Sequence, residues 1–597
     1  MRKGREVYSV LKRVSAKLWW DVNANVPLIR EKDSATAIQV HATPPRDARP
    51  IIGKYYKFTR EVVAKYLGPK SGLIPWRKVV LGNKVQYPDY GEEIILDGQV
   101  VGHIIYDLAE RRWKFRPLYI LAERMVEEGH GYFARIALPR LARGYTIHLD
   151  DLAEHNLPEG TDEYIALGTK NGLFYGVGVK IRKNRIYVLK SWRRRPRGFM
   201  EEDPSWREVV DENREALEEK EREAIEFIRR VKEKYGLPVY VSFSGGKDSL
   251  VTLHLAVKAL GHVKAIFNNT GIEFPQTVEY VRRIAEWMNI DLEIADAGQS
   301  FWKGFESMGP PARDFRWCCK VTKFAPTARL LKRLYPSGAI GLVGQRKYES
   351  STRALSPRIW RNKWFPQGVA ASPIHEWTAL DIWLYIFWRK LLPNSLYYEG
   401  FDRLGCWLCP AVEMGEFEMA ARVAPGLYNE WQLLLKKYAE DRGYPEEWVT
   451  YGLWRWINPP RDILRLLGRR ERWYEEKRGA GVSSERRGEK LRILVEKPRL
   501  KPSDERLKNI VSTACSGASV ENMEVKGPCG EENVVKAAIR AFFCAECLEC
   551  ANWCPAGAIK RRDDGGIYVD ESKCLSCGIC NDKCPLAEYT LKLRNVS

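Results

Sequence analysis

At 597 residues the chain is too long to fold around a single hydrophobic core, and its 45% hydrophobic and 29% charged residues are ordinary for a soluble globular protein. No apolar run reaches the ~18–20 residues of a membrane span, and the N-terminal residues MRKGREVYSVLKRVSAKLWW lack the apolar centre of a signal peptide, so we expect a cytoplasmic protein. The net charge of +20 favours a polyanionic partner, either nucleic acid or a nucleotide, although a soluble surface rich in Lys, Arg and Glu would carry the same excess.

Residues 1–117 are expected to form a β-rich region. Short apolar runs broken by glycine, such as EEIILDGQVVGHIIYD, are typical of strands joined in hairpins. Near the start, LWWDVNANVPLI (18–29) looks like a zinc ribbon that lacks its cysteines. We therefore expect no metal in this part of the chain.

Residues 118–200 contain the strand pattern YIALGTKNGLFYGVGVKIRKNRIYVLKSW, which is punctuated by Gly172, Gly176 and Gly178. This pattern resembles a PUA domain, a small β-barrel usually found on RNA-modifying enzymes, and the resemblance implies RNA, such as tRNA, as a partner. A basic run follows, in which Trp192 would be available for stacking on a base. The residues that would contact RNA phosphates are Arg193, Arg194, Arg195 and Arg197. The alternative is a solvated basic linker.

The middle of the chain changes from charged helix to α/β pattern. Residues 201–235 have apolar positions at helical spacing and predict a connecting helix. Residues 236–465 alternate short apolar strands with helices, which predicts an α/β core. The polar stretch RRERWYEEKRGAGVSSERRGEKLR marks a linker within a small region at 466–535, before a cysteine-dense tail at 536–597.

The segment GLPVYVSFSGGKDSLVTLHLAVKAL predicts a buried strand, a glycine-rich turn and a helix. Backbone N–H groups at such a helix N-terminus bind anions, and Lys247 adds a positive charge. The spacing is not that of a Walker A loop. SGGKDS resembles the pyrophosphate-binding loop of ATP pyrophosphatases, although an ordinary strand–helix turn is the alternative. The residues that this resemblance assigns to nucleotide phosphates are Ser244, Gly245, Gly246, Lys247, Asp248 and Ser249.

Four further motifs resemble the phosphoadenosine phosphosulfate (PAPS) reductase family over roughly residues 236–460. They are FNNTGIEFPQT (267–277), GQRKYESSTR (344–353), PIHEWTALDIW (373–383) and LPNSLYYEGFDRLGCWLCP (392–410). The resemblance implies a Rossmann-like core of the adenine nucleotide alpha hydrolase type that binds ATP, PAPS or adenosine phosphosulfate (APS). Its catalytic candidates are Lys247, Asp248, Arg346, Glu349 and Arg353. For the last three, surface or structural ion pairing is the alternative.

The core also holds two cysteine pairs, Cys318-Cys319 and Cys406-x2-Cys409. Their CC…CxxC order resembles the [4Fe–4S]-binding set of APS reductases and predicts a third cluster, with zinc or a redox-active dithiol as alternatives. Cys515 and Cys529 have no spacing that indicates a function. We expect buried free thiols there, and a redox or persulfide-carrying pair is the alternative.

The tail repeats the pattern C-x2-C-x2-C-x3-C-P twice, which is the spacing of bacterial two-cluster ferredoxins. Zinc knuckles do not use this doubled arrangement. We therefore predict an α+β ferredoxin module with two [4Fe–4S] clusters. One cluster is assigned to Cys544, Cys547, Cys550 and Cys584, and the other to Cys574, Cys577, Cys580 and Cys554.

Two enzymatic functions follow from these motifs. The intact SGGKDS loop favours ATP-dependent thiolation of RNA, and the tail EYTLKLRNVS lacks the nucleophilic cysteine motif of sulfonucleotide reductases. The core cysteines and the fused electron donor fit the second function, reduction of PAPS or APS to sulfite, in which a separate electron donor or acceptor protein could take part. We favour thiolation on the sequence alone, and a non-catalytic RNA-binding or cluster protein is a third possibility.

Overall fold

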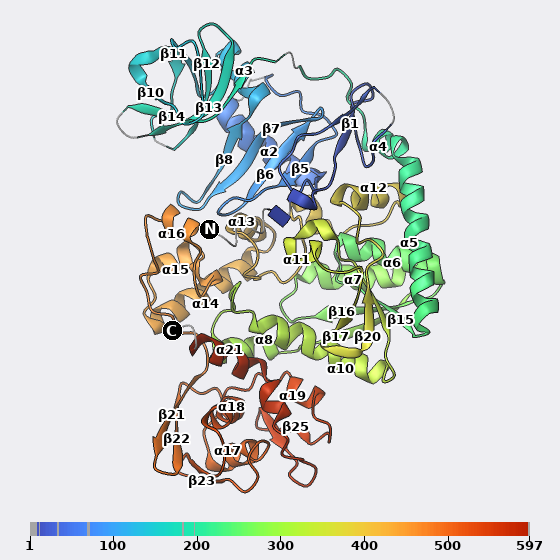
Figure 1. Ribbon diagram of the computed structural model, residues 1–597, viewed down its shortest axis with the longest axis vertical. Helices are drawn as coiled ribbons and strands as arrows, with labels where there is room; N and C mark the ends of the chain where they lie inside the picture. Colours follow the sequence, from blue (N-terminus) through green and yellow to red (C-terminus); the bar gives the residue numbers. More distant parts are fainter. Residues whose placement is uncertain are drawn as a thin grey trace.

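The computed structural model describes residues 9–594 apart from 11, 33–34, 69–71, 161, 182–183 and 196–197. Figure 1 shows an elongated molecule with β-sheets of the N-terminal residues at one end, an α/β region in the middle and the C-terminal residues at the other end. Among the described residues, no helix is long and apolar enough to cross a membrane.

Two antiparallel sheets form the first part of the chain and confirm its β-rich character. The strands are β1 Trp19–Asp21, β2 Val26–Leu28, β3 Ala37–Gln39, β4 Arg49–Pro50, β5 Leu81–Lys84, β6 Gly91–Leu96, β7 Gln99–Asp107 and β8 Arg112–Pro117. The smaller sheet has the order β2-β1-β3 and the larger the order β4-β5-β6-β7-β8. Helix α2 (Gly53–Leu67) buries one face against β7 and β8.

A third sheet contains the residues with the PUA-like pattern. Its strands are β9 Phe133–Ile136, β10 Thr146–His148, β11 Leu152–Asn156, β12 Tyr164–Thr169, β13 Phe174–Ile181 and β14 Arg185–Arg193. The order is β10-β14-β13-β12-β9-β11, and α3 (Tyr119–Glu128) packs on it. Gly178 permits close pairing of β13 with β14, because a Cβ there would come within 2.8 Å of the Tyr187 carbonyl oxygen. The unit projects from one end of the molecule (Figure 1).

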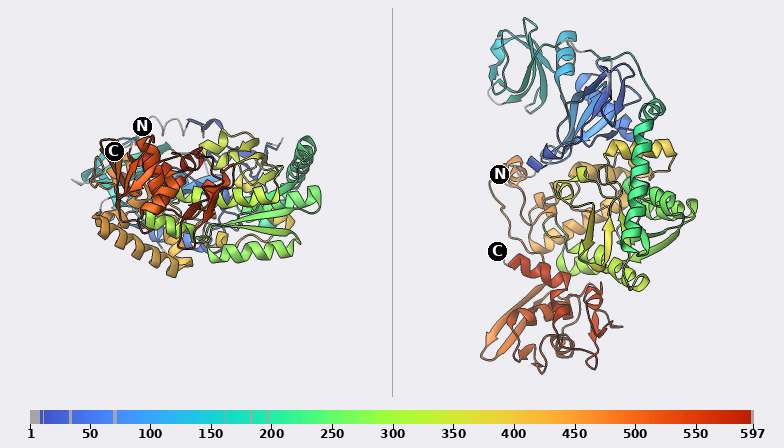
Figure 2. Two further views of the ribbon diagram at one scale, coloured as in Figure 1. Left: turned by 90° about the horizontal axis from the view of Figure 1, so that it is seen from below. Right: turned by 45° about the vertical axis from the view of Figure 1, so that its right-hand side comes forward.

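Two helices, rather than the single one expected, lead into the core. Helix α4 (Trp206–Glu212) begins after Ser205, whose hydroxyl accepts a hydrogen bond from the backbone N–H of Glu208. Helix α5 (Arg214–Tyr235) follows after Asn213, whose side-chain amide donates to the carbonyl oxygen of Pro27 at 2.9 Å. The break at Asn213 therefore ties these helices to β2. The right-hand view of Figure 2 shows α5 running along the core.

The predicted α/β core is confirmed as a six-stranded sheet. Its strands are β15 Val239–Ser242, β16 Lys264–Asn269, β17 Asp291–Asp296, β18 Ile340–Val343, β19 Ile359–Asn362 and β20 Phe365–Ala371. The order is β17-β16-β15-β18-β20-β19, and every neighbouring pair except β19–β20 is parallel. Because the chain passes from β15 to β16 on one side and returns to β18 on the other, the carboxyl end of β15 is the switch point where such folds bind ligands.

Helices and short turns complete the core. They are α6 Lys247–Leu260, α7 Pro275–Trp287, α8 Ser300–Met308, α9 Trp317–Cys319, η2 Lys320–Phe324, α10 Ala325–Leu334, η3 Lys347–Glu349, α11 Ser351–Ala354, α12 Ala379–Arg389 and η4 Ser395–Glu399. A helical group then follows, made of α13 Met414–Val423, α14 Pro425–Arg442, α15 Glu446–Thr450, η5 Leu453–Arg455 and α16 Arg461–Leu466. This group lies between the N-terminal sheets and the C-terminal region (Figure 1).

The C-terminal region begins with a sheet where a linker was expected. Its elements are β21 Gly481–Arg487, β22 Lys490–Glu496, α17 Asp504–Val511, β23 Ser519–Glu521, β24 Glu524–Lys526, α18 Glu531–Phe542, α19 Glu549–Asn552, β25 Ile559–Arg561, β26 Ile567–Val569, α20 Ile579–Asp582 and α21 Pro585–Arg594. The linker prediction is wrong for its second half, because VSSERRGEKLR folds as the hairpin β21–β22. Val482, Leu491 and Ile493 are buried on one face, and the charges between them hid the strand pattern.

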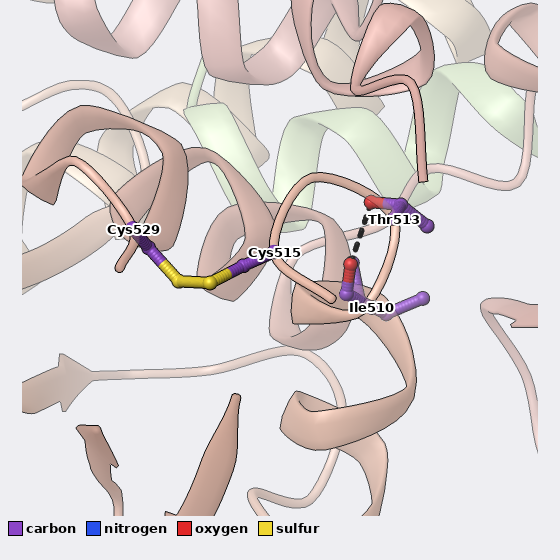
Figure 3. The surroundings of a disulfide bond; sticks show 4 residues. All are labelled: Ile510, Thr513, Cys515 and Cys529. Atoms are coloured by element: carbon purple, nitrogen blue, oxygen red, sulfur yellow. Dashed lines mark hydrogen bonds between the residues drawn. A yellow bond between two sulfur atoms is a disulfide. The ribbon is translucent and has the colours of Figure 1, made fainter. Parts of the chain in front are cut away.

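Cys515 and Cys529 form a disulfide, with their Cα atoms 5.6 Å apart (Figure 3). The prediction of free thiols at these positions is therefore wrong. The two cysteines are 14 residues apart in the sequence, and the hairpin β23–β24 between them brings them together. A role in redox or persulfide chemistry stays a hypothesis.

Candidate functional site

The glycine-rich loop lies at the carboxyl end of β15, where α6 begins. Gly245 has a φ of +77°, which glycine adopts freely, and a Cβ there would come within 2.9 Å of the Thr277 side chain. The Ser249 hydroxyl accepts a hydrogen bond from the backbone N–H of Ser244 at 3.2 Å and donates to the Gly246 carbonyl oxygen at 2.9 Å. These contacts hold a compact turn at a helix N-terminus, which suits a phosphate group.

Lys247 is buried among acceptors. Its Nζ donates to the Asp402 carbonyl oxygen at 2.9 Å and lies 3.3 Å from Oδ2 of Asp248. Its backbone N–H donates to the Tyr397 hydroxyl at 2.8 Å. Burial would raise the pKa of Asp402, but Lys247 and Arg49 outweigh it and hold that pKa well below its usual range. The loop lysine therefore sits in a buried network with at least two ionised carboxylates.

Arg346 bridges two carboxylates from distant parts of the chain. Its Nη1 donates to both oxygens of Asp47, at 2.9 and 2.8 Å, and its Nε donates to Asp248. Burial would raise the pKa of Asp248, but Arg346 and Lys247 outweigh it and lower that pKa. Asp47 precedes β4, so an N-terminal residue reaches the loop of the core.

Glu349 and Arg353 continue this network. Glu349 accepts a hydrogen bond from the backbone N–H of Arg346 at 3.0 Å and forms an ion pair with Nη1 of Arg353. The structure thus brings Lys247, Asp248, Arg346, Glu349 and Arg353 into one connected set of charges. Structural ion pairing of the last three residues also agrees with these contacts.

A cavity of about 600 Å³ opens beside the network. A volume of this size is typical of small-molecule sites. The N-terminal residues that line it include Asp47, Lys84, Gln86, Tyr87 and Asp89. The sequence did not predict that these residues line the cavity, because they belong to no motif and approach the core only in the fold. Asp402, which lines the cavity too, lies within one of the recognised motifs.

Two glutamates on the cavity share one lysine. Lys84 Nζ lies 2.9 Å from Oε2 of Glu413 and 3.1 Å from Oε1 of Glu416. Burial, together with the neighbouring Glu413, raises the pKa of Glu416 to about 7. Burial would also raise the pKa of Glu413, but Lys84 outweighs it and holds that pKa well below its usual range. Glu416 can therefore hold or release a proton near neutral pH beside the cavity.

The four core cysteines gather beside the same cavity. Cys406 and Cys409 line it, and the thiol of Cys318 interacts with those of the other three. Arg316 Nη2 lies 3.4 Å from Sγ of Cys319. A hydrogen bond from the Cys318 thiol, with Arg316 and a neighbouring lysine, lowers the pKa of Cys319 to about 5.

The cysteines of the tail gather in two sets of four. In the first set, the thiol of Cys547 interacts with those of Cys550, Cys544 and Cys584. The second set, Cys554, Cys574, Cys577 and Cys580, lines one small cavity. In each set one cysteine, Cys584 or Cys554, comes from the other repeat of the sequence. Within the described residues, no three His, Cys, Asp or Glu side chains converge closely enough to hold a single metal ion.

Helix α21 connects the tail to the core cysteines. It begins directly after Cys584 and packs against α8 and α9, and α9 contains the adjacent core cysteines. Glu588 on α21 forms an ion pair with Lys320, the residue that follows α9. The ring of Tyr589 meets the ring of Phe315 edge-on, with the ring centres 5.6 Å apart. The two cysteine regions are thus joined through direct contacts.

Helix α10 provides a second docking surface for the tail. Arg329 donates to the carbonyl oxygen of Cys547 at 3.0 Å, and the Asn552 amide donates to the carbonyl oxygen of Ala325 at 3.0 Å. Lys303 on α8 forms an ion pair with Glu546. The tail is therefore packed on the part of the core that contains Cys318 and Cys319.

The basic run at the end of β14 lies away from the cavity. Arg193–Arg195 are exposed, and Arg197 lies outside the described residues. Trp192 is half-buried and meets the Tyr119 ring edge-on, with the ring centres 6.1 Å apart. The Trp192 ring, which was expected to stack on a base, is therefore partly covered by Tyr119.

A mostly parallel sheet with the glycine-rich loop at its switch point defines an α/β nucleotide-binding core of the adenine nucleotide alpha hydrolase type. Residues 238–412 match the phosphoadenosine phosphosulfate reductase domain. An uncharacterized protein of Methanocaldococcus jannaschii is 34% identical over 473 residues, which cover 74% of this chain and 96% of that protein. The chain belongs to the PAPS reductase family.

Two further proteins are similar to parts of the chain. The adenosine 5'-phosphosulfate reductase of Lysinibacillus sphaericus is 26% identical over 233 residues, which cover 36% of this chain and 94% of that enzyme. The crystal structure of PAPS reductase from Candida auris covers 34% of this chain and 95% of its own, with 21% identity and a TM-score of 0.26.

Proposed function

We propose that this chain reduces an adenylyl sulfate, APS or PAPS, to sulfite, and that its C-terminal region delivers the electrons. The observation that carries the proposal is the packing of α21 against α9, since it joins the cysteines of the tail to those of the core. RNA thiolation, which the phosphate loop alone favours, requires no such path for electrons. The similarity to enzymes named APS reductases supports the same reaction.

Three [4Fe–4S] clusters are part of the proposal. Four thiolates around one cubane bind four different iron atoms, so they stand further apart than four thiolates around one ion. The described cysteine sets meet the first requirement, because each brings four thiols together. Lys323 lies beside the core set, where Cys406 raises the pKa of its ammonium group. When bound, such clusters supply electrons one at a time.

The reaction consumes two electrons and two protons. The bond between sulfur and the bridging oxygen of the nucleotide phosphate breaks, the sulfur is reduced, and bisulfite and AMP leave; PAPS would leave adenosine 3',5'-bisphosphate instead. The electrons would come from a separate reduced low-potential carrier protein. Cys577 is exposed and Leu575 beside it is 67% exposed, so the second tail set offers an entry point at the surface.

The residues of the cavity would bind and orient the nucleotide. The loop with Lys247, which lies beside the cavity, would hold its phosphate, and Arg346, which lines the cavity, would donate hydrogen bonds to the substrate in place of Asp47. Arg316, which points to the core thiols, would attract the sulfate group. Glu416 would supply a proton to the departing phosphate or sulfite oxygen, since its pKa of about 7 permits exchange at neutral pH.

RNA thiolation remains a second candidate because of the β9–β14 unit. That sheet stands at one end of the molecule with three exposed arginines, which a reductase of a small nucleotide does not need (Figure 1). In this alternative ATP would be cleaved at the loop, and RNA would be held by the basic run.

One anaerobic assay separates the two reactions. The full-length protein, reduced with an artificial low-potential donor, would be incubated either with APS or PAPS, or with ATP, tRNA and labelled sulfide as the sulfur source. We expect sulfite and AMP or adenosine bisphosphate in equal amounts, with no pyrophosphate. Pyrophosphate and sulfur-labelled tRNA, without sulfite, would overturn the reductase proposal and establish thiolation.

A further inference from the structure

Arg540 on α18 is a buried charge whose donors are only partly used. The residue is 1% exposed, and its Nη1 donates to the hydroxyl of Thr513 at 3.2 Å and to Oδ1 of Asn581. Its Nε and Nη2 have no hydrogen-bond partner among the described residues. Two buried guanidinium donors without acceptors cost free energy of folding, so their position indicates that a ligand accepts these hydrogen bonds.

The surroundings of Arg540 are sulfur atoms from both tail sets. Helix α18 packs against α20, which contains Cys580, and against α21, which follows Cys584. Burial by itself would lower the pKa of the guanidinium, but the thiols of Cys580, Cys550, Cys584 and Cys544 outweigh it and raise that pKa. Cys580 belongs to the second tail set, and the other three belong to the first.

We propose that Arg540 is a shared positive charge between the two cluster sites of the tail, and that it donates its free N–H groups to sulfur atoms of the bound clusters. The inference rests on the proposed clusters and adds a residue that sets their reduction potentials. Thr513 and Asn581 act as positioning residues, since they hold Nη1 and leave the other donors turned away from them.

The physical effect has a definite sign. A [4Fe–4S] cluster with four thiolates becomes more negative by one charge on reduction, and a cation beside it stabilises the reduced state. Hydrogen bonds to sulfur act in the same direction. Because Arg540 neighbours both sets, its charge should raise both potentials and keep them close, which favours transfer of an electron from one site to the other.

The test compares Arg540→Gln with Arg540→Lys in the full-length protein purified without oxygen. Potentials of the tail clusters would be measured by redox titration followed with electron paramagnetic resonance. We expect Arg540→Gln to lower at least one potential by about 59 mV, a tenfold fall in the reduced-to-oxidised ratio at fixed potential. Arg540→Lys keeps the charge and should shift the potentials less than Arg540→Gln.

Lys536→Gln is the matched control. Lys536 lies one turn earlier on α18, and its charge is compensated by Glu532 and Asp582, both at 2.7 Å. This variant removes the same charge from the same helix and should leave the potentials unchanged.

Iron content distinguishes a failure of the proposed clusters from a failure of the role of Arg540. Wild-type protein with fewer than about eight iron atoms would overturn the clusters and this inference together. Full iron content with unshifted potentials in Arg540→Gln would overturn the role of Arg540 alone. If Arg540→Gln fails to retain iron, Arg540→Lys is decisive, because it keeps the charge but loses the fork of N–H donors. Potentials equal to those of wild type in Arg540→Lys would then overturn the donation of hydrogen bonds to the cluster sulfur atoms.

Discussion

Asp47 accepts two hydrogen bonds from Nη1 of Arg346, across 299 residues of sequence. Asp47 also accepts a hydrogen bond from the backbone N–H of Ala379, the first residue of α12, at 2.6 Å. One N-terminal carboxylate thereby holds Arg346 and a helix N-terminus of the core.

We predict that Asp47→Ala destabilises the protein and weakens nucleotide binding. Removing one partner of a buried ion pair costs about 3–5 kcal/mol, so the melting temperature should fall by several degrees, and KM for the nucleotide should rise more than kcat falls. Glu215→Ala is the control, because its pair with Arg30 is exposed and should contribute little. Equal melting temperatures for both variants would contradict the structural role of Asp47.

The glycine-rich loop that begins α6 is the basis of a second prediction. Lys247→Ala should lower nucleotide turnover at least ~100-fold, because it removes a charged contact to phosphate from a buried site. Iron content should stay at the wild-type value. Lys258→Ala, at the other end of α6, should turn over nucleotide at a rate within a few-fold of wild type. Turnover by Lys247→Ala within threefold of wild type would mean that the loop is not the nucleotide site.

Iron analysis tests the core cysteines. The wild-type protein should contain about twelve iron atoms, and the double variant Cys318→Ser with Cys319→Ser about eight. The resonance signals of the tail clusters should remain. The double variant Cys515→Ser with Cys529→Ser removes the disulfide and should leave the iron content unchanged. An unchanged iron content in the Cys318/Cys319 variant would exclude a cluster at the core.

The raised pKa of Glu416 predicts that the stability of the protein depends on pH. Its folded pKa of about 7 lies above the ~4.3 of a free glutamate, so it favours the folded state below about pH 4.3 and loses this contribution as the pH rises to 7. Relative to wild type, Glu416→Gln should therefore gain stability between pH 5 and 8, by roughly 2 kcal/mol. Glu413 has a lowered pKa, so its contribution is fully present above about pH 4.3, and Glu413→Gln should be less stable than wild type by an amount that stays constant between pH 5 and 8. Melting curves of both variants at pH 5, 6, 7 and 8 test this, and parallel behaviour of the two would contradict it.

Local sequence patterns predicted the parts of the site that are contiguous in the chain. The strand, the glycine turn and the helix around Lys247 follow from apolar spacing and from the backbone freedom of glycine, which act over a few residues. The same holds for the cysteine repeats of the tail. The hairpin β21–β22 was not predicted from the sequence, because its exposed charged residues obscured the short alternation of buried apolar and exposed polar residues.

Sequence by itself determined the α/β core, the family and the candidate residues of the loop, because these depend on spacing within short segments. Only the tertiary structure decided that Asp47 and Lys84 form a wall of the cavity, that Cys515 bonds to Cys529, and that α21 packs beside Phe315. Such contacts join residues far apart in the chain, and they depend on how whole sheets and helices bury their apolar faces against one another. No local pattern encodes which of the many polar residues will meet when those faces pack.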